Sequence, residues 1–147
     1  MSKVHCLLIA SLAAVSLVSP MAAVAAENDP MACVVTVDYS LNNVSRLSYT
    51  KAFVVGPEAP FSDDFSTATR LRSFDASLSV ESGDPVVSAT FFADVSTFNG
   101  VGFQASLRVR DEAHGETTSG RNYFYSSVTG AAGTHVTTYS MTCERAK

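Results

Sequence analysis

Beyond Pro30 the chain is dominated by short segments in which apolar and polar residues alternate. The clearest runs from Phe74 to Val80, where Phe, Ala, Leu and Val are separated by Asp and Ser. A period of two is typical of a half-buried β-strand, because successive side chains point to opposite faces. No segment of this region carries a convincing apolar stripe with the helical spacing i, i+3, i+4 and i+7. The pattern therefore predicts an all-β domain.

About seven such segments are separated by turn-forming residues, for example Asn99-Gly100. Short strands at regular spacing predict an antiparallel β-sandwich. A small closed β-barrel is the alternative, because strand lengths and turns do not report whether a sheet closes. Within each predicted strand, the alternating positions that share one face are Cys33, Val35, Val37, Tyr39 and Leu41; Leu47, Tyr49, Lys51, Phe53 and Val55; Phe74, Ala76, Leu78 and Val80; Val87, Ala89, Phe91, Ala93 and Val95; and Phe103, Ala105, Leu107 and Val109. Tyr123 and Tyr125 belong to a further strand, and Val136 to Cys143 forms the last.

The longest predicted loop runs from Gly56 to Thr69, because this segment is rich in Pro, Asp and Ser. Phe61 and Phe65 lie within it. They are expected either to cover the core as a lid or to pin the loop in place.

The N-terminal segment has the organisation of a secretory signal peptide. Lys3 precedes an apolar run from Leu7 to Val18, and Ala23 and Ala25 form a small-residue cleavage pattern. The apolar run is too short to span a hydrocarbon core of ~30 Å comfortably. We therefore expect residues 1–26 to be a cleaved signal peptide and residues 27–147 to form a single β-rich domain. The protein is expected to be secreted or periplasmic, without a membrane anchor.

The charge of the predicted mature chain limits its partners. Without Lys3, nine basic residues face fourteen acidic ones, a net charge near −5 with the histidines neutral. A mildly acidic chain argues against nucleic-acid binding, which needs clustered Lys and Arg to displace counterions. The same balance argues against binding to anionic membranes.

Two cysteines remain after the predicted cleavage, Cys33 near the start and Cys143 near the end. In an oxidising compartment they predict one disulfide between the first and the last strand. Such a disulfide would close a loop of roughly 110 residues. In the chain-entropy model, a loop of this length stabilises the folded protein by about 4–5 kcal/mol, because it restricts the unfolded chain. The alternatives are two buried free thiols, or metal ligation without a partnering histidine motif. No cofactor and no metal are predicted.

Histidines and carboxylates are the candidates for catalysis. His114 lies in the polar segment 111–116, which is better explained as a solvated turn than as a metal site, and His135 begins a strand, where a surface or hydrogen-bonded imidazole is the commoner role. Asp63 and Asp64 are adjacent, and with Glu58 they are a weak calcium candidate; we expect a solvated acidic loop. No serine occupies a G-x-S-x-G nucleophile motif.

Arginines alternate in two segments. Arg70 and Arg72 flank Leu71, and Arg108 and Arg110 flank Val109. If the two strands were neighbours, four guanidinium groups could form a face that recognises anions, since Arg pairs bidentately with carboxylates. A solvated surface with nearby aspartates as counter-charges is the simpler interpretation.

Residues 119–125 are predicted to be an exposed turn that leads into an aromatic strand. Ser119, Arg121, Tyr123 and Tyr125 form the candidate binding site, because Tyr and Arg are the residue types that carry binding hot spots. The pattern Ser119-Gly120-x-x-Tyr123 resembles a loop of the periplasmic lysozyme inhibitors, which are small disulfide-bearing barrels. The resemblance covers five residues, and the rest of the chain does not share the pattern of that family.

Three functions follow in order of preference. The first is a non-enzymatic binding or inhibitor protein outside the cytoplasm, whose partner is another protein or an envelope or host component. The second is a structural subunit of a surface fibre or coat that assembles through an open sheet edge. The third is a hydrolase that uses His114 or His135.

Overall fold

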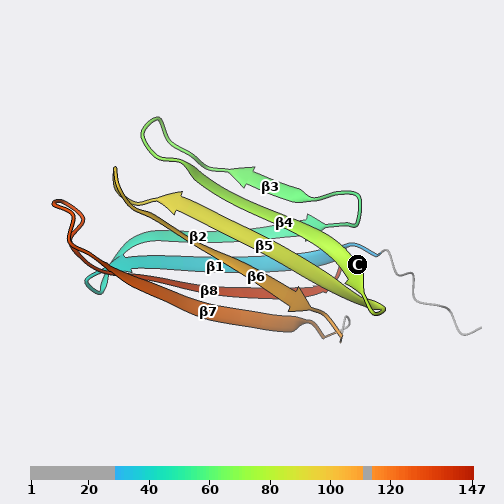
Figure 1. The fold of residues 1–147 in the computed structure, drawn as a ribbon. Coiled ribbons are helices and arrows are strands. Elements are labelled where there is room, and N and C mark those ends of the chain that lie inside the picture. The colour runs from blue at the N-terminus through green and yellow to red at the C-terminus, as the bar shows by residue number, and fades with distance from the viewer. Residues whose placement is uncertain (1–28, 111–113) are drawn as a thin grey trace, which may run out of the picture.

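Two four-stranded antiparallel sheets pack face to face in the computed structural model, which describes residues 29–110 and 114–147 (Figure 1). The predicted signal peptide lies outside the described residues. Among the described residues no helix is long and apolar enough to cross a membrane. Sheet I has the order β2 (Val44–Val55), β1 (Met31–Leu41), β8 (Gly133–Arg145), β7 (Glu116–Ser126), and sheet II the order β3 (Phe61–Asp64), β4 (Arg72–Glu81), β5 (Asp84–Asp94), β6 (Gly100–Arg108).

The chain passes between the sheets twice, from β2 to β3 and from β6 to β7. All other consecutive strands are antiparallel neighbours within one sheet. The first strand pairs with the last, so β1 and β8 form the centre of sheet I. The prediction of an antiparallel sandwich is confirmed, and the sheets do not close into a barrel.

The predicted loop from Gly56 to Thr69 contains an additional strand, β3, which makes eight strands where about seven were expected. Phe61 pairs with Ala76 of β4 and stacks on Phe53 with ring centroids 5.0 Å apart. Phe65 stacks on Tyr49 at 4.5 Å. Both phenylalanines therefore belong to the core boundary, and β3 was missed because four residues are too few to display a period.

Most of the alternating apolar positions face the space between the sheets, whereas Tyr123 and Tyr125 point away from it. Phe74, Phe91, Val35 and Val87 are at most 1% exposed. Aromatic rings bridge the two layers, because Phe103 of sheet II stacks on Tyr139 of sheet I with centroids 4.1 Å apart. Offset stacking of this kind adds to the stabilisation that comes from burial alone.

Gly120 allows the close approach of Tyr139 to β7. A Cβ atom at position 120 would lie 2.6 Å from Cε1 of the Tyr139 ring. The ring of Tyr139 covers the glycine on the core side of sheet I, an arrangement that compensates for the missing side chain within a strand. This packing explains why a Ser-Gly-Arg-Asn segment of turn-like composition forms part of a strand.

The predicted disulfide between Cys33 and Cys143 is confirmed. The two residues are direct partners in the β1–β8 register, with Cα atoms 4.1 Å apart and exposures of 3% and 0%. The bond therefore joins residues that are already neighbours in the sheet, although 110 positions separate them in the chain.

Removal of the disulfide is expected to destabilise the domain strongly. The chain from Glu27 onward, which contains all eight strands, should lose about 4–5 kcal/mol of unfolding free energy in the variant Cys33→Ala/Cys143→Ala. Urea unfolding followed by circular dichroism measures the loss. Dithiothreitol should lower the urea midpoint of unfolding of the native protein and leave that of the variant unchanged. Equal midpoints for the oxidised native protein and the variant would show that the disulfide does not stabilise the fold.

Candidate functional site

The candidate binding residues lie in the middle of strand β7, not in a turn. Residues 119–123 pair with residues 136–140 of β8, so the prediction of an exposed turn is wrong for this segment. Their alternation places one set of side chains on the side of β7 that points away from the core. This set is called the β7 face and consists of Ser119, Arg121, Tyr123 and Tyr125.

The tyrosine rings of the β7 face are unusually open to solvent. Tyr123 is 77% exposed and Tyr125 is 74% exposed. Their direct partners on β8 are Val136 and Thr134, which are short, so the rings rise above the sheet. Arg121 is also exposed, and within the part of the chain that the structure describes it makes no ion pair. A guanidinium group and two aromatic rings are thus available along one strand.

A buried histidine supports the β7 face from beneath. The ring of Phe124 stacks on His135 with centroids 4.3 Å apart, and His135 is 1% exposed. Nε2 of His135 donates to the carbonyl of Ala131, and in the neutral ring Nδ1 accepts from the Tyr39 hydroxyl, each at 2.9 Å. Burial raises the pKa of Tyr39. The expectation of a hydrogen-bonded imidazole at position 135 is confirmed, and both ring nitrogens serve the packing of β8.

His114 and its neighbours are only partly described, because residues 111–113 of the predicted polar turn lie outside the described residues. His114 itself is exposed and follows that gap. Among residues 29–110 and 114–147 no group of three or more His, Cys, Asp or Glu side chains is arranged to hold a metal ion.

The four arginines of the predicted anion face do not converge. Arg70 and Arg72 lie where β4 begins and Arg108 and Arg110 where β6 ends, with β5 between these strands, so the two pairs occupy opposite ends of the domain. Arg72 also falls on the same side of β4 as Phe74, whereas Arg108 points outward from β6. The condition for a shared face, that the two strands are neighbours, is not met.

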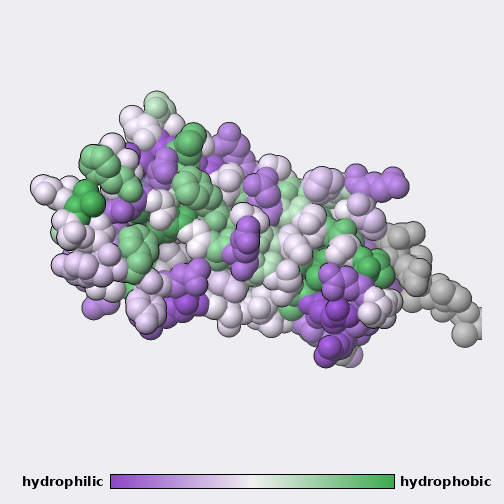
Figure 2. Space-filling model, in the orientation of Figure 1, coloured by the Kyte–Doolittle hydropathy of each residue, from purple (hydrophilic) through white to green (hydrophobic). Residues whose placement is uncertain are grey.

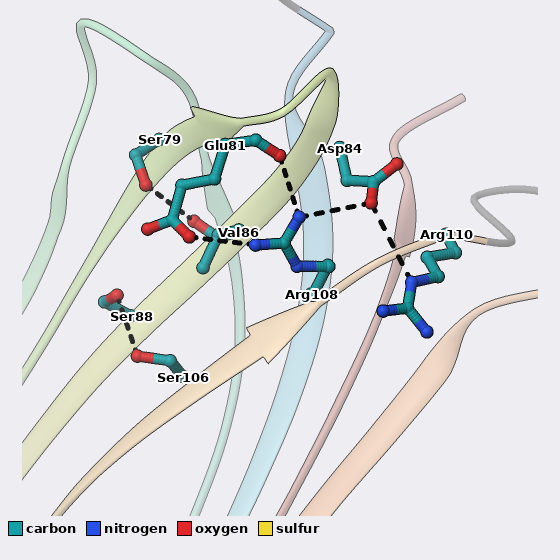
Figure 3. A network of polar contacts seen from close by, with 8 residues as sticks. All are labelled: Ser79, Glu81, Asp84, Val86, Ser88, Ser106, Arg108 and Arg110. Atoms are coloured by element: carbon teal, nitrogen blue, oxygen red, sulfur yellow. Dashed lines mark hydrogen bonds and ion pairs between the residues drawn. The ribbon is translucent and has the colours of Figure 1, made fainter.

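Arg108 and Arg110 fasten β6 to the β4–β5 turn (Figure 3). Arg108 donates to the backbone carbonyl of Glu81 at 2.8 Å, to the Glu81 carboxylate at 3.0 Å and to Asp84 at 3.3 Å. Nε of Arg110 lies 3.8 Å from the same Asp84 carboxylate. Because these groups are partly exposed, each pair contributes on the order of 0–1 kcal/mol.

The adjacent carboxylates Asp63 and Asp64 do not form a solvated acidic loop. They lie in β3 and point to opposite sides of the strand. Asp63 accepts a hydrogen bond from the Tyr49 hydroxyl at 2.9 Å and pairs with Nζ of Lys51 at 3.0 Å. Hydrogen bonds from Lys51 and Tyr49 lower the pKa of Asp63, and burial together with Asp63 raises the pKa of Tyr49. Hydrogen bonds from Ser66 lower the pKa of Asp64.

A shallow apolar hollow on the outside of sheet I was not anticipated from the sequence. It has a volume of about 520 Å³ and is lined chiefly by β1 and β2. Val34 and Val54 within it are 49% and 57% exposed. The pairs Val34-Val35 and Val54-Val55 interrupt the period of two, and this interruption is the sequence signal for outward-facing valines.

No protein-family model and no curated protein matches the chain. The five-residue resemblance to the periplasmic lysozyme inhibitors is therefore not extended by a longer match. The segment that carries it is also a strand in this fold and not a loop.

Asp63→Asn tests the interpretation of Asp63 as a structural carboxylate. The pKa of Asp63 is lower in the folded protein than in the unfolded chain. The ionised carboxylate therefore stabilises the fold above about pH 4, and this stabilisation is lost as the pH falls through the folded-state pKa. The variant should lose about 1 kcal/mol at pH 7, because Lys51 and Asp63 are partly exposed. In urea unfolding, the difference in unfolding free energy between the variant and the native protein should shrink as the pH is lowered. Asp38→Asn, on the outer side of β1, is the control, and a constant gap would contradict the assignment.

Proposed function

We propose that the protein is an exported, non-enzymatic binding protein that recognises a partner through the β7 face. The partner is another protein or an envelope or host component. The observation that carries the proposal is the exposure of Tyr123 and Tyr125 beside Arg121 on one side of a regular strand.

The chemistry of these residues suits recognition. A tyrosine ring offers a large apolar surface and a hydroxyl, and only two side-chain torsions are ordered when it binds. Arginine adds a planar guanidinium group that can pair with a carboxylate or stack on a ring. Neighbouring positions on β8 carry Thr134, Thr138 and Ser140, which offer hydroxyl groups without obstructing an approaching partner.

The β7 strand is also held in a defined position before any partner binds. It pairs with β8 along its full length, and Phe124 packs against buried His135. The side chain of Asn122 donates to the carbonyl of Gly102 at 3.1 Å, which ties β7 to β6 of the opposite sheet. A rigid surface loses little conformational entropy on association, and more of the contact energy then appears as affinity.

The predicted export agrees with this function. The disulfide between Cys33 and Cys143 is suited to an oxidising compartment outside the cytoplasm. A disulfide-linked sandwich is a stable support for a binding face in that setting.

Truncation of the β7 face tests the proposal. The oxidised chain from Glu27 onward is used to capture partners from envelope and host extracts, the captured protein or glycan is purified, and its affinity is measured by calorimetry. Arg121→Ala and Tyr123→Ala should each weaken binding by at least about tenfold.

Phe98→Ala is the matched control, because Phe98 is an equally exposed aromatic residue at 73% but does not belong to the β7 face. All variants should keep the native circular dichroism spectrum. Unchanged affinity in Arg121→Ala/Tyr123→Ala would refute the proposal.

Strand β2 supports the structural-subunit function as a second candidate. It is a twelve-residue edge strand of sheet I, and the strand at the corresponding edge of sheet II, β3, has only four residues. An open edge of this length can accept a strand from another copy. Light scattering over a range of concentrations should then detect assembly, and a strict monomer at the highest concentration rules this candidate out.

A further inference from the structure

One end of the sandwich gathers exposed apolar side chains. This end, called the loop end, consists of the Asn42-Asn43 turn and residues 65–71, 95–99 and 127–132 with the adjoining strand termini. Leu71 is 65% exposed, Phe98 is 73% exposed, and Val44 beside the turn is 53% exposed. Figure 2 shows several hydrophobic residues at this end, on the left, with hydrophilic ones between them, and a hydrophilic group beside hydrophobic residues at the opposite end.

Hydrogen bonds between the loops hold these side chains in place. The amide of Asp94 donates to the carbonyl of Leu71 at 2.8 Å, and the amide of Leu71 donates to the Asp94 carboxylate at 3.1 Å. The Ser96 hydroxyl accepts from the amide of Phe98 at 3.2 Å. The exposure of Leu71 and Phe98 is therefore built into ordered loops, and exposed apolar groups of this kind mark a contact surface when they gather together.

Charge is distributed unequally between the two ends. At the loop end, Asp64 and Asp94 accept hydrogen bonds from backbone amides, of Ser66 and Leu71 respectively. The basic residues there are Arg46, Arg70 and Arg72. The opposite end carries Asp29, Glu58, Glu81, Asp84, Glu116 and Glu144 together with Arg108, Arg110, Arg145 and Lys147. Among the described residues the loop end therefore has one basic residue in excess, and the opposite end has two acidic residues in excess.

We propose that the loop end binds the surface of an anionic lipid bilayer. Leu71 and Phe98 enter the interface, and Arg46 and Arg70 lie at the level of the headgroup phosphates, as amphipathic side chains do at membrane surfaces. The acidic end points away from the membrane and orients the molecule. Docking of a second copy is less favourable, because two loop ends would bring their arginines together. The net charge of the chain averages over both ends and does not describe the loop end alone.

Vesicle flotation tests the proposal with the chain from Glu27 onward, which lacks the apolar N-terminal run. The protein should float with vesicles of phosphatidylcholine and phosphatidylglycerol at low salt and bind less in high salt, because the screening length falls to about 10 Å at 0.1 M. Leu71→Ser/Phe98→Ser should reduce the partition coefficient by at least about tenfold. Arg70→Ala should weaken binding to the anionic vesicles and leave the weaker binding to pure phosphatidylcholine unchanged.

Tyr123→Ala is the matched control, since Tyr123 is exposed on the β7 face and outside the loop end. It should bind vesicles normally, and Leu71→Ser/Phe98→Ser should keep its affinity for a partner of the β7 face, so the two proposals fail independently. Absence of flotation with anionic vesicles at low salt overturns the inference. Vesicle binding that is not weakened in Leu71→Ser/Phe98→Ser also overturns it. The same holds if the native protein does not bind vesicles but forms a concentration-dependent dimer that the double variant does not form.

Discussion

The antiparallel pairing of β1 with β8 is the constraint on which the rest of the structure depends. These strands are the first and the last of the domain, and each carries one of the flanking strands of sheet I. Their register is held near one end by the Cys33–Cys143 bond and near the other by the hydrogen bond between Tyr39 and His135. Such non-local pairing is slow to form, because loop closure is unfavourable until the contacts are made. A covalent link between these strands therefore stabilises the least local part of the fold.

The exposure of the β7 face follows from that register. A shift of one residue between β7 and β8 would turn Tyr123 and Tyr125 toward the core. Two contacts oppose such a shift: Tyr139 occupies the space above Gly120, and Phe124 stacks on His135. The same buried histidine thus takes part in the β1–β8 pairing and in the support of the candidate binding surface.

The domain presents two surfaces of different character. The β7 face is a regular strand with aromatic and guanidinium groups above hydroxyl side chains, which suits a partner with a defined shape. The loop end is apolar and flanked by arginines, which suits a disordered anionic surface such as a bilayer.

The sequence by itself determined the β class, the core-facing side of most strands and the disulfide, because a period of two and two distant cysteines are properties of the chain alone. The tertiary structure decided what depends on non-local packing. Strand β3 is held in place because Phe61 packs on Phe53 and the following Phe65 packs on Tyr49. The two arginine pairs are separated because β5 lies between β4 and β6. The tyrosines of β7 face outward because of the register between β7 and β8. Strand order and register arise from contacts between residues far apart in the chain, and local periodicity does not encode them.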